Sequence, residues 1–157
     1  MKLNISHLYP YLPYGMKWKF DGEDLTHDVV GLDITNRGVK LVSPYNDYGD
    51  CEISSGKPIL LPISSLYTEM EDGKVPIVEI YKKMFVLPRI KEYKIEDGCL
   101  KFDKHTFEWV DEFRAFSLDG DTAYITIEVS YYLDENHFDW RYGLIDKGLA
   151  LDKTKIK

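Results

Sequence analysis

Asp134, His137 and Asp139 are the residues of this chain whose types and spacing come nearest to a catalytic or metal-binding group. Two carboxylates around one imidazole could hold a divalent metal ion, or could let the histidine act as a general base. On a helix, Asp134 and His137 share a face while Asp139 points elsewhere, so a metal site needs a further ligand from a distant segment. The spacing favours a helix-capping, hydrogen-bonded histidine. A small metal-dependent or His/Asp-dependent hydrolase is therefore the alternative hypothesis, and we expect no metal and no cofactor.

The chain contains none of the motifs that mark the large, easily recognised classes of enzymes. It has no Walker A loop, no GxGxxG run, no GxSxG elbow, no HExxH helix and no CxxC pair. Its two cysteines, Cys51 and Cys99, lack the spacing of a zinc site, and we expect both to be reduced. These absences favour a non-catalytic protein.

Tyrosines in predicted loops are the main indication of binding. The chain has 12 tyrosines and 3 tryptophans, more than one core of this size needs. Tyrosine combines apolar area with a hydroxyl group and few rotatable bonds, which suits protein interfaces and stacking on flat ligands. The candidate binding tyrosines are Tyr11, Tyr14, Tyr45 and Tyr48. The alternative is that these side chains are half buried under their own loops.

Lys17, Lys19 and Arg37 are a second group of candidate binding residues. The predicted fold of the first forty residues brings them near each other, together with Lys40. Such a basic group could contact the phosphates of a small nucleotide, or it could keep one face of a sheet solvated.

The elements that must position these residues begin with a three-stranded antiparallel meander. Apolar and polar residues alternate over residues 15–20, 29–34 and 39–43, which is the period of a half-buried strand. A four-residue loop between the second and third strands would place Leu32 opposite Leu41.

A hairpin and helices are predicted for the rest of the chain. Asp97-Gly98 is a strong two-residue turn signal, joining strands at residues 91–96 and 99–103 with Ile95 opposite Leu100. Helices are expected near residues 64–71, 76–84 and 136–147.

The C-terminal part offers two competing patterns. Strict alternation from Ala123 to Tyr131 predicts a strand. Beyond it, a helix over 136–147 would place Phe138 and Ile145 on one side, and Gly148 would end it. Together the elements predict an α+β fold, with an antiparallel sheet and a few short helices packed on it, including a C-terminal helix. At 157 residues we expect one domain, in which residues 1–50 form the meander part and residues 51–157 an α+β part sharing the core.

The net charge and the lack of long apolar segments limit the classes of partner that the chain is expected to bind. A net charge of −7 without a basic stripe disfavours binding to duplex nucleic acid and tilts the partners towards a protein or a small-molecule ligand. No window approaches the length of an apolar membrane span, and the first residues lack a signal peptide, so we expect a cytoplasmic protein without a membrane partner.

Several segments resemble a group of small uncharacterised proteins encoded by phages and prophages of gut Bacteroidetes. The similar segments are residues 12–16 (LPYGM) and 57–66 (KPILLPISSL), and the triplets HFD at 137–139, GLI at 143–145 and GLA at 148–150. The family has an apolar helical run before its HFD triplet, whereas this chain has β-branched alternation there. The helix start is therefore left open between Ser130 and Asn136.

The resemblance implies a phage setting, in the cytoplasm of a host bacterium. It supplies no catalytic residue. We expect a non-catalytic accessory protein that sequesters a host protein or a small nucleotide-like ligand, as in counter-defence. The hydrolase and a structural virion component are the alternatives, and assembly with copies of itself stays open.

Overall fold

The structure is a computed structural model that describes residues 1–42, 48–86 and 89–156. The contacts divide the chain into two compact units. Unit 1 contains Met1–Pro62 and Asp134–Lys157, and unit 2 contains Ile63–Leu133. Strands, nearly all antiparallel, combine with short helices, so the predicted α+β fold is confirmed. The prediction of a single domain with a shared core stays a prediction.

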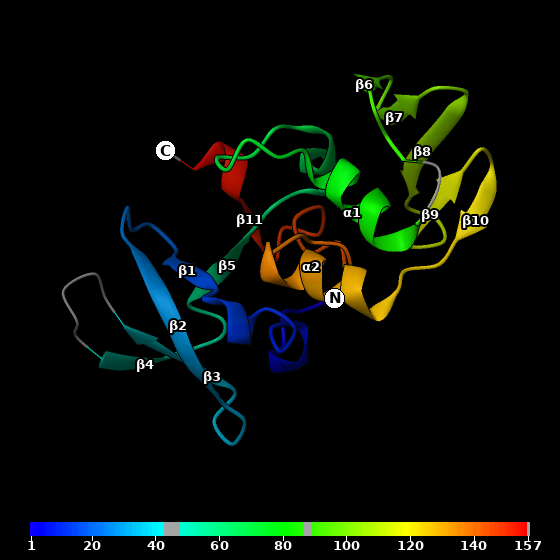
Figure 1. The fold of residues 1–157 in the computed structure, drawn as a ribbon. Helices are drawn as coiled ribbons and strands as arrows, with labels where there is room; N and C mark the ends of the chain where they lie inside the picture. The colour runs from blue at the N-terminus through cyan, green and yellow to red at the C-terminus, as the bar shows by residue number, and fades with distance from the viewer. Residues whose placement is uncertain (43–47, 87–88, 157) are drawn as a thin grey trace. The chain divides into compact units, whose positions relative to one another are not determined.

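Unit 1 is built on a six-stranded sheet in the order β11-β5-β1-β2-β3-β4. β11 pairs with β5 in parallel, and all other neighbours are antiparallel (Figure 1). The strands are β1 (Lys17–Phe20), β2 (Thr26–Asp33), β3 (Gly38–Val42), β4 (Tyr48–Glu52), β5 (Gly56–Leu60) and β11 (Leu151–Asp152). The short 3-10 helices of this unit are η1 (Ile5–His7), η2 (Leu12–Tyr14) and η4 (Lys153–Lys155).

The predicted meander is present as β1, β2 and β3, but the partner of Leu32 on β3 differs from the expected one by two residues. Leu32 pairs with Val39 and not with Leu41, because the turn consists of residues 34–37 and is closed by the pair Asp33 and Gly38, one residue earlier than expected. A separate register shift lies between Val29 and Gly31. The shift accommodates an extra residue in β2, as in a β-bulge. Ile34 then falls in the turn and is 71% exposed.

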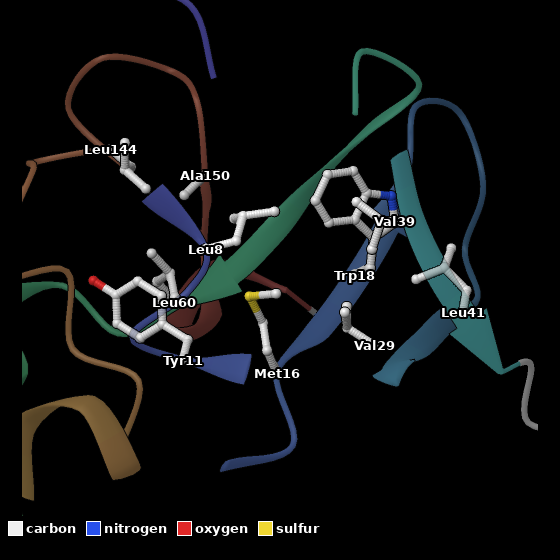
Figure 2. Close-up of a cluster of buried hydrophobic side chains, with 10 residues drawn as sticks. All are labelled: Leu8, Tyr11, Met16, Trp18, Val29, Val39, Leu41, Leu60, Leu144 and Ala150. Carbon is white, nitrogen blue, oxygen red and sulfur yellow. The ribbon is translucent and has the colours of Figure 1, made fainter. Parts of the chain in front are cut away.

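The core of unit 1 lies against the inward face of this sheet. Trp18 of β1 is fully buried, whereas the preceding residue, Lys17, is exposed. This follows from the alternation of side chains between the two faces of a strand. Figure 2 shows the buried cluster, in which Trp18 and Met16 join residues of the N-terminal turns and of the C-terminal segment. The ten clustered side chains are Leu8, Tyr11, Met16, Trp18, Val29, Val39, Leu41, Leu60, Leu144 and Ala150.

Unit 2 contains a five-stranded antiparallel sheet in the order β10-β9-β8-β7-β6 (light green to yellow in Figure 1). The strands are β6 (Lys94–Glu96), β7 (Cys99–Phe102), β8 (His105–Val110), β9 (Ala115–Leu118) and β10 (Asp121–Ala123). The predicted hairpin is confirmed, with Ile95 opposite Leu100. Asp97 and Gly98 have φ of 55° and 69°, the two positive values that a type I′ turn requires.

Helix α1 (Pro76–Met84) has the predicted bounds. Pro76 occupies the first turn, where its missing N–H costs nothing, and Ile77, Ile80 and Tyr81 are buried. The helix predicted at 64–71 is instead the five-residue 3-10 helix η3 (Ile63–Tyr67). The N–H of Thr68 bonds to the carbonyl of Ser65, three residues back, so the tighter winding continues to the end of that segment.

The C-terminal helix exists, but as α2 (Ile127–Glu135) and not at 136–147. The strand predicted for 123–131 is therefore wrong beyond Ala123. Thr126 caps the helix, because its hydroxyl accepts from the N–H of Val129 and its carbonyl accepts from Ser130. Helical winding buries Val129 and Leu133, which are four residues apart.

Residues 136–147 form turns, because several of them adopt left-handed backbone conformations. His137 has φ of 58° and Gly143 has φ of 58°, values that an α-helix does not contain. Gly148 does have the left-handed backbone expected of it, with φ of 68°, but it was predicted to end a helix over 136–147 that is not present. None of the helices in the described ranges has the length and apolarity of a membrane-spanning segment.

Candidate functional site

Asp134 lies near the end of α2, where residues of its own chain occupy its carboxylate. It is 4% exposed. Oδ1 accepts from Nε1 of Trp140 at 2.8 Å and from Nε of Arg141 at 3.1 Å, and Oδ2 accepts from Nη2 of Arg141 at 2.7 Å. The Arg141 guanidinium also lies 4.1 Å from the Trp140 ring centroid. This bidentate, stacked arrangement is a structural clamp.

His137 and Asp139 have separate structural tasks. The N–H of His137 donates to the carbonyl of Asp134, and the His137 carbonyl accepts from Leu61 at 2.9 Å. The buried Asp139 carboxylate accepts from the N–H of Ile145 at 2.7 Å. Across the described ranges, no three or more His, Cys, Asp or Glu side chains form a group that could hold a metal ion. The structure thus gives Asp134, His137 and Asp139 no common metal centre.

The candidate tyrosines have different surroundings. Tyr11 is fully buried, and its hydroxyl donates to the carbonyl of Phe138 at 3.2 Å, so it is a core residue and not an open loop residue. Burial, followed by the charges of Asp139 and Asp134, raises the pKa of Tyr11. Tyr14 is half-buried in η2. Tyr45 lies outside the described residues, and for Tyr48 only its backbone position in β4 is described.

The predicted basic group is dispersed. Lys17 forms an ion pair with Asp28, close to the start of β2, whereas Arg37 lies in the turn beyond the far end of that strand. Lys19 pairs across the sheet with Lys57 of β5 instead. The structure therefore does not unite Lys17, Lys19 and Arg37 into one phosphate-binding group.

Exposed apolar side chains on α2 and on the segment just before it are the feature that the sequence patterns missed. Tyr124, Ile127 and Tyr131 are 79%, 70% and 56% exposed, and we call these three residues the α2 face. Ile127 and Tyr131 are one helical turn apart, so both point away from the buried side of Val129 and Leu133. Read as a strand, the segment places Tyr131 on the inward side with Val129. The cap at Thr126 is the sequence signal that could have revealed the helix.

The α2 face belongs to the more acidic unit. Unit 2 has 14 acidic and 9 basic residues, against 13 and 11 in unit 1. Lys83 of α1 lies 3.4 Å from the Glu128 carboxylate and 5.6 Å from the centroid of the Tyr132 ring. These contacts hold α2 on α1 while leaving the α2 face uncovered.

Unit 2 also contains a histidine and carboxylate pair that the sequence did not indicate. Nδ1 of His105 lies 2.6 Å from Oδ2 of Asp119, and the N–H of Thr106 donates to Oδ1 of Asp119 at 2.8 Å. The bond from His105 lowers the pKa of Asp119. These bonds tie the start of β8 to the turn after β9.

Burial raises the pKa of the Cys99 thiol to about 11, so this thiol is protonated at neutral pH and is a poor nucleophile.

Comparisons with protein-family models, with curated proteins and with solved structures found no match to this chain.

Proposed function

We propose that this chain is a non-catalytic binding protein whose α2 face docks on a protein partner with a basic surface. The observation that carries the proposal is the exposure of Ile127 and Tyr131 on one side of a capped helix, with Tyr124 exposed three residues before the helix begins. Contiguous exposed apolar side chains on a folded domain commonly mark interaction sites. Tyrosine is enriched at the centres of protein interfaces, because it buries much apolar area and still offers a hydroxyl.

The helix is well suited to present this face. Thr126 caps its first turn, the side chains of Val129 and Leu133 anchor it, and Lys83 ties it to α1. A partner that binds a preformed helix loses less conformational entropy than one that must order a loop. Because little conformational entropy is lost, the three large side chains of the α2 face can be enough to bind a partner.

Charge gives the class of partner. Unit 2 carries five more acidic than basic residues, and Glu135 at the end of α2 is exposed. An acidic surface around an apolar centre attracts a basic protein surface and accelerates the encounter at low salt. We therefore propose a protein partner whose binding surface is rich in lysine or arginine and has an apolar centre.

The resemblance to phage and prophage proteins supplies a setting for this proposal. A small accessory protein of a phage can act by occupying a host protein, and the α2 face provides a surface with which to do so. Sequestration of a host protein is therefore the function that we propose, with the cytoplasm of the host bacterium as its place of action.

The test is capture of partners from a lysate of gut Bacteroidetes cells, with identification by mass spectrometry. Ile127→Asp and Tyr131→Ser should each abolish recovery of a partner that the unaltered protein retains, and raised salt should weaken that recovery. Phe113→Ser is the matched control, because Phe113 is 62% exposed in the same unit but lies outside the α2 face.

The circular dichroism spectra of all variants should match that of the unaltered protein, because the substituted side chains are exposed. A partner recovered equally well by the α2 variants would contradict the proposal, as would the failure to recover any basic protein. Recovery of a chemically altered small molecule whose production needs His137 would instead favour the hydrolase.

A further inference from the structure

Unit 1 contains a hollow of about 400 Å³ that is separate from the α2 face. Its apolar side is formed by Leu3, Ile53 and Leu149, which pack against the buried core cluster. Lys2 and Lys57 provide positive charge, and Asp21 is the acidic residue of the lining. Small-molecule sites in proteins commonly have volumes of about 300–1,000 Å³, with mostly apolar walls and a few polar groups. The hollow is at the small end of that range.

Lys57, one of the two lysines that line the hollow, belongs to the half-buried lysines. The structure describes four of them, Lys19, Lys57, Lys83 and Lys101. Lys83 and Lys101 form ion pairs with glutamate side chains, whereas Lys19 and Lys57 form none with any described residue. The charge of Lys57 is therefore not compensated by an ion pair with any described residue.

Lys19 and Lys57 also face each other directly across the β1–β5 pair. Like charges at directly opposed positions of antiparallel strands destabilise the sheet. An anion held at Lys57 would relieve both the missing counter-charge and this repulsion. Lys17, which lies two residues before Lys19 on β1, already forms an ion pair with Asp28 and needs no further counter-charge.

A buried donor that the protein leaves unused lies behind Gly56. The Trp18 side chain is fully buried, and its Nε1 has no hydrogen-bond partner among the described residues. The indole packs against Gly56, which lines the hollow, and a Cβ at Gly56 would collide with that nitrogen. Buried donors without a partner are rare in native proteins, and this one lies behind the Gly56 backbone and is not part of the lining of the hollow.

We infer that this hollow binds a small amphipathic anion, with its phosphate or carboxylate group at Lys57 and Lys2 and its apolar part against Leu3, Ile53 and Leu149. Asp21 and the hydroxyl of Ser54 offer hydrogen-bond acceptors for a polar substituent of the ligand. The inference is independent of the α2 face, which lies in unit 2.

The test uses the full chain with phenyl phosphate and hexyl phosphate as probes, inorganic phosphate as the charge-only probe, and phenol as the apolar-only probe. Amide resonances of Ser54, Gly56 and Lys57 are followed by NMR during titration. At least one of the two organic phosphates should bind saturably with Kd below about 1 mM. Inorganic phosphate and phenol should each bind at least about tenfold more weakly, because each lacks one half of the contacts.

Lys57→Gln should weaken binding of the organic phosphate at least about tenfold, and Lys2→Gln should weaken it less, because Lys2 is more exposed. The matched control is Lys17→Gln, which alters a lysine on β1 outside the hollow and should leave binding unchanged. The inference is overturned if neither organic phosphate shifts these resonances saturably. It is also overturned if Lys57→Gln, folded by circular dichroism, binds as well as the unaltered chain.

Discussion

At the scale of single residues, Asp134 has the clearest structural role in the described chain. Three donors from Trp140 and Arg141 converge on its two oxygens, and burial strengthens each of these bonds. The same residue attracted attention in the sequence as a possible ligand or catalytic acid. Its spacing from His137 and Asp139 was readable from the sequence, but the convergence of an indole and a guanidinium upon it depends on the turns that follow α2.

Removing this carboxylate should be costly. We expect Asp134→Ala to lower the free energy of unfolding by about 3 kcal/mol, at the lower end for a broken buried pair because Arg141 keeps some contact with water. Urea denaturation would measure the change. Glu135→Ala, at the exposed neighbouring position, is the control and should stay within about 0.5 kcal/mol. Equal effects of the two substitutions would show that the clamp contributes no stability.

Two histidines predict a dependence of stability on pH. Burial, then the charges of nearby lysines, lowers the pKa of both His137 and His7 from the ordinary value of 6.5. Below that value the unfolded chain binds protons that the folded chain does not. The free energy of unfolding should therefore have its full value above about pH 7 and should fall as the pH drops from about 7 to about 5.

The substitution His137→Asn should make this fall shallower, since asparagine tolerates the left-handed backbone of this position and does not titrate there. Chemical denaturation at a series of pH values is the measurement. Depressed carboxyl pKa values, as at Asp33 and Asp119, act only at lower pH, so they leave this window clear. A slope that is identical in the variant would rule out His137 as a source of the dependence.

At the scale of elements, local sequence signals predicted the structure correctly where a segment fitted only one pattern. Pro76 and the apolar spacing after it gave α1, and Asp97-Gly98 gave the hairpin. The 123–131 segment was different, because its β-branched alternation fits a strand while its Val129 and Leu133 spacing fits a helix. Thr126 as a cap decided the competition in favour of the helix.

The candidate site was harder to predict than the fold. Tyr11 was expected in a loop open to a partner, yet its hydroxyl bonds to the carbonyl of Phe138, a residue 127 positions away. No pattern near Tyr11 reports such a partner. The α2 face was missed for a related reason, since the exposure of Ile127 and Tyr131 follows only once the helix is known.

The buried and exposed sides of α2 predict different costs of substitution, and this difference distinguishes a helix from a strand at residues 127–133. We expect Leu133→Ala to cost about 2–5 kcal/mol as a core truncation, because Leu133 is fully buried. Ile127→Ala should cost less than about 0.5 kcal/mol, because this side chain is mostly exposed. Thermal and urea unfolding would compare them. A strand over this segment would bury Ile127 with Val129 and would make Ile127→Ala the costly change.

At the scale of the whole molecule, the acidic excess is distributed over both units. Neither unit has more basic than acidic residues, and unit 2 carries most of the excess. On the sheet of unit 1, Lys17 is paired with Asp28, whereas Lys19 and Lys57 form no ion pair with a described residue. No unit as a whole therefore offers the basic surface that displaces the counterions of a duplex.

We accordingly expect no micromolar binding of duplex DNA near physiological ionic strength, about 0.15 M. A mobility-shift titration at that salt concentration checks the expectation. A shift that persists there would assign a binding role to Lys17, Lys19 and Arg37 after all, and substitution of each by glutamine would then identify which of them contacts the phosphates.

β11 pairs with β5, and Phe138 pairs with Leu61, which affects how the protein folds during its synthesis. All of unit 2 leaves the ribosome before the residues that complete unit 1. Unit 2 is contiguous and can fold while synthesis continues, as domains generally do. Until Phe138 and Leu151 emerge, β5 is an open sheet edge, the kind of surface that pairs with other chains. A pause in translation between residues 133 and 151 would therefore be the moment at which this protein is most exposed to aggregation.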